Sequence, residues 1–154
     1  MEEDRKFHGN RFNGISLIFF REKRLIEFNY DFLNCSIRQN QLICEGFIKP
    51  TEFSIDYKIR IVYDGRTSPK VYVLNPTIEY NDDIHMFSSD KSLCLYHSEI
   101  DNFYWKKKKH HLYDTIIPWS IEWFVYYEIY LISGKWEHPY IEHRKIENPN
   151  RFSA

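Results

Sequence analysis

Hydrophobic and polar residues alternate most regularly in residues 53–63, near the middle of the chain. The residues of one side are Phe53, Ile55, Tyr57, Ile59 and Ile61, and those of the other are Ser54, Asp56, Lys58 and Arg60. This period of two predicts an antiparallel strand with one face against the core. Asp64-Gly65 then signals a turn, and a second apolar run ends at Asn75-Pro76.

Two shorter apolar runs precede this strand. They lie within residues 31–50 and are separated by the polar stretch "RQNQ" at residues 38–41. Together with the strands at 53–63 and 70–75, they predict an antiparallel meander of four strands.

Helical spacing of apolar residues is found on either side of the meander. In residues 11–28 the polar stretch "REKR" would face solvent, which predicts an N-terminal helix. In the second helix Thr115 can cap the start, Pro118 fits the first turn and Gly134 can end it. The stripe of this helix, which we expect to pack in the core, is Ile116, Trp119, Trp123, Tyr126, Tyr127 and Tyr130.

A long segment without clear periodicity, residues 75–114, separates the meander from the second helix. Loops of this length in a compact domain are commonly functional. The order of elements therefore predicts an α+β fold with a functional loop. Within the loop, "SLCLY" is one short apolar run.

Length and charge narrow the class of protein. The chain has 154 residues, 43% of them hydrophobic, which fits a single domain. We expect the core of this domain to cover about residues 11–136 and the polar tail, residues 137–154, to be flexible. A net charge of −1 does not favour nucleic-acid binding. Charges interrupt every apolar run, and the N-terminus lacks a signal-peptide core, so we expect no membrane contact and a cytoplasmic location.

The three cysteines are Cys35, Cys44 and Cys94. Their number is odd and no CxxC pair exists, so we expect no disulfide framework, no metal site and no cofactor. The adjacent His110 and His111 also lack the spacing of a zinc site. Cys35 and Cys44 fit small core residues. Of the three interpretations of Cys94, the lack of partners at metal-ligand spacing disfavours a metal ligand, and a buried strand residue or a nucleophile remains.

The order of elements resembles the ubiquitin-conjugating enzyme (UBC) fold, in which a helix, a four-stranded meander, a long segment with the catalytic cysteine and further helices follow one another. His85 stands where the family has the histidine of a His-Pro-Asn signature, and Leu93-Cys94-Leu95 matches its cysteine segment. Trp105 matches the tryptophan that often follows. The Pro and Asn are absent, since Met86 and Phe87 follow His85.

A narrower resemblance covers roughly residues 41–143 and concerns the standalone conjugating-enzyme-like proteins of bacterial antiphage CBASS operons. The matching segments are Leu93–His97, Thr115–Trp119, Glu122-Trp123, Tyr127-Glu128 and Gly134–Trp136. The resemblance implies an acyltransferase whose Cys94 forms a thioester with the C-terminus of a partner, the operon's cyclic-nucleotide synthase (CD-NTase), and passes it to an amine of an acceptor protein. The chain has no room for an adenylating domain, so activation must come from another protein or from exchange of an existing acyl bond.

Acyl transfer through a thiol requires a nucleophile, a donor for the oxyanion and a proton acceptor. By resemblance Cys94 is the nucleophile. His97 and His85 are candidates for proton transfer, although on an extended segment His97 needs a bend to reach the thiol. Asn75 and Tyr96 are candidates for the missing oxyanion donor.

A basic run follows the cysteine segment. It comprises Trp105, Lys106, Lys107, Lys108 and Lys109. It fits either a solvated loop or a docking site for an acidic partner. Two other functions remain open for the whole chain: a non-catalytic UBC-like module that binds the same partner, which the missing Asn favours, and a cysteine hydrolase that acts on the partner's tail.

Overall fold

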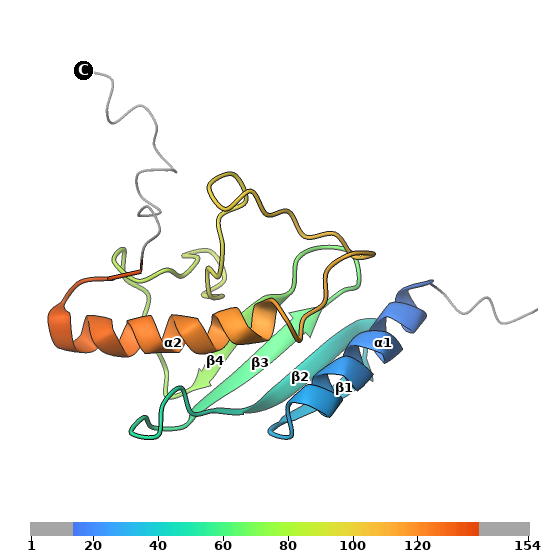
Figure 1. Cartoon of the computed structure of the whole chain (residues 1–154), viewed down its shortest axis with the longest axis horizontal. Coiled ribbons are helices and arrows are strands. Elements are labelled where there is room, and N and C mark those ends of the chain that lie inside the picture. Colours follow the sequence, from blue (N-terminus) through green and yellow to red (C-terminus); the bar gives the residue numbers. More distant parts are fainter. Residues whose placement is uncertain (1–13, 139–154) are drawn as a thin grey trace, which may run out of the picture.

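A computed structural model describes residues 14–138 and has the predicted α+β architecture (Figure 1). Its elements, in chain order, are α1 (Gly14–Asn29), β1 (Leu33–Arg38), β2 (Gln41–Ile48), β3 (Tyr57–Tyr63), β4 (Lys70–Asn75) and α2 (Ile116–Ser133). The strands form one antiparallel sheet in the order β1-β2-β3-β4. The predicted helix–meander–loop–helix order, consistent with a UBC-like fold, is therefore confirmed.

Both helices pack on the same face of the sheet. Tyr57 and Tyr63 lie six residues apart on β3, so their side chains point to the same side. Tyr57 stacks on Phe124 of α2 with ring centroids 4.4 Å apart, and Tyr63 meets Phe19 of α1 edge-on at 6.3 Å. Figure 1 shows α1 beside β1 and β2, and α2 across β3 and β4. The core lies between this sheet face and the two helices.

The predicted start of the third strand is wrong. The alternating pattern placed Phe53 and Ile55 on its buried face, but their side chains are 91% and 58% exposed and β3 begins at Tyr57. Residues 51–54 instead form a turn, in which the Ser54 backbone N–H donates to the Thr51 carbonyl at 3.1 Å. The Ser54 hydroxyl also donates to Glu128 of α2 at 2.5 Å, so a tertiary contact fixes the turn.

The ends of α2 follow the prediction only in part. Gly134 ends the helix in the left-handed conformation, at φ 75°, as expected. Thr115 precedes the helix but does not cap it, because its hydroxyl donates to the His111 carbonyl at 2.5 Å. Ile116 and Trp123 of the predicted stripe are buried, while its other members, Trp119, Tyr126, Tyr127 and Tyr130, are half-buried.

The expectation that no disulfide forms is also wrong. Cys35 of β1 and Cys44 of β2 are both buried, as predicted, but they are joined by a disulfide. The register places the two residues directly opposite each other, with Cα atoms 4.1 Å apart. The two-residue hairpin at Gln39 and Asn40, both with positive φ, sets this register. Cys94 is therefore the cysteine that is not part of a disulfide.

A buried carboxylate ties α1 to the end of the long loop. The Glu22 side chain is fully buried, and its carboxylate meets His111 Nδ1 at 2.9 Å. It also accepts a hydrogen bond from the Leu112 backbone N–H at 3.2 Å and pairs with Arg21 at 2.9 Å. Since Leu112 leads directly into α2, this carboxylate connects the two helices across the core.

We expect Gly46→Ala to destabilise the protein by about 2 kcal/mol, within the range of overpacking. A Cβ atom at Gly46 would lie 2.0 Å from the Phe32 carbonyl oxygen, so the backbone before β1 must move. Urea unfolding of the variant measures the loss. Gly14→Ala is the matched control, because no atom lies within 4 Å of its added Cβ. An equal stability of the two variants would contradict this assignment.

Candidate active site around Cys94

A short hairpin in the long loop positions Cys94. Met86 and Leu93 form an isolated antiparallel bridge, and the Cys94 backbone N–H donates to the His85 carbonyl at 3.0 Å. The Leu93 N–H donates to the Val71 carbonyl of β4 at 2.9 Å, which attaches the hairpin to the edge of the sheet. The cysteine therefore stands on a supported segment rather than on a free loop.

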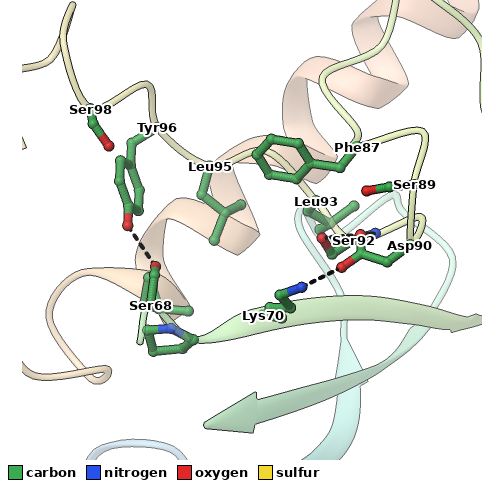
Figure 2. A pocket seen from close by; sticks show the side chains of 12 residues that line it. Ser68, Lys70, Phe87, Ser89, Asp90, Ser92, Leu93, Leu95, Tyr96 and Ser98 are labelled. Atoms are coloured by element: carbon green, nitrogen blue, oxygen red, sulfur yellow. Dashed lines mark hydrogen bonds and ion pairs between the residues drawn. The ribbon is translucent and has the colours of Figure 1, made fainter. Parts of the chain in front are cut away.

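Asp90 holds the turn of this hairpin. One of its carboxylate oxygens accepts hydrogen bonds from the Ser92 N–H at 2.9 Å and the Ser92 hydroxyl at 2.6 Å, and the other pairs with Lys70 at 2.6 Å (Figure 2). Burial acts to raise the pKa of Asp90, but the hydrogen bonds from Lys70 and Ser92 hold this pKa well below its usual range. Asp90 therefore stays ionised at neutral pH.

The Cys94 thiol lies in a narrow recess and only 5% of the residue is exposed. Its Sγ lies 3.4 Å from the Tyr96 carbonyl oxygen, so the chain bends directly after the cysteine. The side chains that line the recess with it are His85, Leu95, Trp119, Glu122, Trp123, Trp136 and His138. Three tryptophans, two histidines and one carboxylate thus surround the thiol.

Helix α2 and the chain that follows it build the walls of the recess. Trp123 of α2 is buried, and its indole N–H donates to the His85 carbonyl at 2.6 Å. After Gly134 the chain reverses and runs back alongside α2 (Figure 1). Trp136 then stacks on the His85 imidazole, with ring centroids 5.0 Å apart and an interplanar angle of 14°. The turn at Gly134 therefore closes the recess.

His138 and Glu122 form a pair at the edge of this recess. His138 Nε2 lies 3.2 Å from Glu122 Oε1, and only 7% of the histidine side chain is exposed. Tyr126 meets the imidazole edge-on at 4.4 Å. Burial lowers the pKa of His138 below its ordinary 6.5, although the Glu122 and Asp101 carboxylates act to raise it. The imidazole is therefore neutral at pH 7 and able to accept a proton.

A family model described as "Type II CBASS E2 protein" matches residues 22–144, which include Cys94 and every residue that lines the recess. The chain belongs to the Type II CBASS E2 family. E2 denotes a ubiquitin-conjugating-like protein, in agreement with the fold. It is thus an E2-like protein of an antiphage system, and its family works with other CBASS operon proteins. Among curated proteins, none matches the chain.

In this CBASS E2 protein, the predicted candidates do not all lie beside the thiol. His85 lines the recess. His97 does not, and instead forms part of a turn: its N–H donates to the Asp101 carboxylate at 2.7 Å, and its Nδ1 lies 3.4 Å from the Ile100 N–H. Asn75 ends β4, where it is exposed and pairs with Lys58 across the sheet.

Tyr96 points into a second cavity, of about 320 Å³, on the other side of the cysteine segment. Its hydroxyl is hydrogen-bonded to the Ser68 hydroxyl at 2.5 Å (Figure 2). Burial raises the pKa of the Tyr96 phenol, the Ser68 hydrogen bond acts to lower it, and nearby Cys94 raises it further. Leu95 lines both cavities, so one side chain separates the recess of the CBASS E2 protein from this larger space.

The basic run of the CBASS E2 protein divides into two parts. Trp105 is half-buried and its indole N–H donates to the Tyr63 hydroxyl at 3.2 Å, so it packs inward. Lys106–Lys109 are all exposed and form a tight turn, closed by His110 Nδ1, which accepts from the Lys106 N–H at 2.9 Å. Docking of a partner by these lysines stays a prediction.

Sequence reasoning gave no role to Glu122, Trp136 or His138. Glu122 and Trp136 lie in segments of the family resemblance, whereas His138 falls in the part of the chain interpreted as a polar tail. The available signal is the Gly134-Lys135-Trp136 stretch, which indicates that the chain stays ordered beyond α2. Residues 14–138 contain no group of three His, Cys, Asp or Glu side chains placed to hold a metal ion. None of their helices is long and apolar enough to cross a bilayer.

Proposed function

We propose that this CBASS E2 protein is a cysteine acyltransferase that carries the C-terminal acyl group of a partner as a thioester on Cys94. The observation that carries the proposal is the grouping of the Cys94 thiol with a neutral imidazole and its carboxylate partner in one recess. A nucleophile, a base and a group that orients the base are the parts that acyl transfer through a side chain requires.

His138 is the base in this proposal. An unperturbed thiol has a pKa of about 8.5, so most of it is protonated at pH 7 and needs a proton acceptor. The neutral His138 imidazole takes the thiol proton, and Glu122 stabilises the imidazolium that forms. His85 supports the nucleophile, since its carbonyl holds the Cys94 N–H and the Trp123 indole.

The reaction has two steps. In the first, Cys94 Sγ attacks the carbonyl carbon of an activated C-terminus, a new C–S bond forms, and the old acyl bond breaks as its leaving group takes the proton. In the second, an amine of the acceptor protein attacks the thioester, the C–N bond of an amide forms, the C–S bond breaks, and the Cys94 thiolate takes up the proton that the amine loses. The chain needs no metal or cofactor for either step, because the acyl group arrives already activated.

The donor in this proposal is the C-terminus of the CD-NTase encoded in the same operon, and its conjugation primes that synthase. Membership of the family, whose proteins work with CBASS operon proteins, supports this choice. The shape of the recess also supports it, since a narrow space accepts a flexible chain end more readily than a folded surface.

A non-catalytic binding module is the second candidate function. The observation that favours it is the 5% exposure of Cys94, because a thiol that never becomes accessible transfers nothing. In the acyltransferase, the recess must open far enough to admit the end of the donor chain. In the binding module it stays closed while another surface holds the partner.

The test is co-expression of the protein, or its Cys94→Ala or Cys94→Ser variant, with the operon's CD-NTase, followed by denaturing electrophoresis with and without a thiol reductant. We expect a covalent adduct that reductant cleaves in the unaltered protein, no adduct with Ala, and a reductant-resistant oxyester with Ser. An adduct that persists with Ala rules the proposal out. Co-purification without any adduct supports the binding module, and a shortened CD-NTase supports a hydrolase.

A further inference from the structure

We infer that the indole Nε1–H of Trp136 is the hydrogen-bond donor to the oxyanion that forms when Cys94 is acylated. This inference rests on the proposed acyl transfer, for which no oxyanion donor has yet been assigned. The tetrahedral intermediate carries a full negative charge on the former carbonyl oxygen, and a preorganised donor in a dry site is a large contribution to such catalysis.

The first observation is an unused donor. Trp136 Nε1 is buried from solvent and has no hydrogen-bond partner among residues 14–138. Most buried polar groups in folded proteins are satisfied, so a buried orphan requires an explanation. An indole N–H only donates, so the group suited to it is an acceptor that arrives with a substrate.

The second observation is its location. Trp136 and Cys94 line the same narrow recess. The indole stacks on the His85 imidazole at 5.0 Å and contacts Trp123 at 5.3 Å. Since the His85 carbonyl holds the Cys94 N–H, the indole and the thiol are positioned by the same residue. The residue that carries the orphan donor therefore lines the compartment in which the intermediate would form.

The third observation is that four alternative groups are already paired, lie elsewhere or are apolar. The Cys94 N–H, a common oxyanion donor, and the Trp123 indole both donate to the His85 carbonyl. The Tyr96 hydroxyl is paired with Ser68 in the other cavity, and Asn75 lies at the exposed end of β4. Phe87 occupies the position of the signature Asn and has no polar group.

The step balances with this donor in place. Cys94 Sγ forms a bond to the acyl carbon, the π pair of the C=O bond moves onto its oxygen, and that oxygen accepts a hydrogen bond from Trp136 Nε1–H. The proton of the thiol passes to His138. The pair then returns to re-form C=O, the bond to the leaving thiolate breaks, and His138 gives that thiolate the proton. The indole keeps its own proton throughout.

The test uses the full-length protein and a peptide with the last residues of the CD-NTase, supplied as a small alkyl thioester so that no activating enzyme is needed. Trp136 is replaced by benzothienylalanine, which exchanges the indole N–H for sulfur and keeps the bicyclic shape, and in a second variant by Phe. We expect the maximal rate of Cys94 acylation, measured by mass spectrometry, to fall about 100-fold in both, as on removal of other oxyanion donors, while KM for the peptide changes little.

Alkylation of the same thiol by iodoacetamide is the internal control. Displacement at a saturated carbon forms no oxyanion, so the benzothienylalanine variant should be alkylated at the rate of the unaltered protein. A loss of both reactions would mean that Trp136 only shapes the recess, and would overturn the inference. Unchanged acylation would overturn it too. If the unaltered protein is itself not acylated while Cys94 is alkylated, the proposed function fails first and this inference fails with it.

Discussion

Replacing Glu22 with alanine should lower the free energy of unfolding by about 3 kcal/mol, the lower end of the cost of breaking a buried ion pair. The Glu22 carboxylate is fully buried and is the partner of His111 Nδ1, the Leu112 N–H and Arg21. Its removal leaves the buried Leu112 N–H without its acceptor, takes away the partner of His111, and opens a gap between α1 and the start of α2. The loss is measured by urea unfolding followed by tryptophan fluorescence.

Glu27→Ala is the matched control for this prediction. Glu27 lies on the same helix and pairs with Lys23 at 2.7 Å, but both side chains are partly exposed. Such a pair contributes less than about 1 kcal/mol. If the Glu22 and Glu27 variants were equally stable, the buried carboxylate would not connect the helices as described.

Replacing His138 with glutamine should reduce acyl transfer at pH 7 by about 100-fold or more, the usual contribution of a positioned general base. Burial lowers the pKa of His138 below 6.5. In the unaltered protein most of the imidazole is therefore still neutral at pH 6.5, and the rate should fall only as the pH drops further, through this lowered pKa. The variant has no such base, so its rate should instead rise with pH in proportion to the fraction of thiolate. The pH dependence of acylation by the peptide thioester separates the two profiles.

His110→Gln is the matched control for this histidine. Burial, with Lys109 and Lys106, also lowers the pKa of His110, yet its side chain closes the lysine turn and does not line the recess. Its replacement should leave both the rate and the pH profile unchanged. A His138 variant with an unaltered profile would remove this residue from the mechanism.

Local pattern was sufficient for most of the fold. The period-two alternation of Tyr57, Ile59 and Ile61 survives in β3 because one face of that strand meets both helices. The same alternation continues through Phe53 and Ile55, but these residues do not belong to the strand. A hydrogen bond from Ser54 to Glu128 fixes a turn there, and because the two residues are 74 positions apart, no local pattern indicates this contact. The Cys35–Cys44 disulfide depends on strand register, which counting cysteines does not provide.

The site was predictable only where it is local. Cys94 and His85 lie nine residues apart on one hairpin, and their motif indicates both. His138 and Trp136 come to the same recess because the chain reverses at Gly134, about forty residues after the cysteine, and Glu122 comes from the intervening helix. No sequence periodicity encodes a reversal of this kind. The proposed base and the proposed oxyanion donor therefore emerge only from the three-dimensional arrangement.

The three tryptophans around Cys94 bear on how long an acyl group would survive there. A thioester in water is lost to hydrolysis, and a cysteine in water is lost to oxidants. Trp119, Trp123 and Trp136 leave the sulfur almost no contact with solvent. If Cys94 carries an acyl group as proposed, this exclusion of water protects the unloaded thiol from oxidation and slows hydrolysis of the thioester before an amine binds.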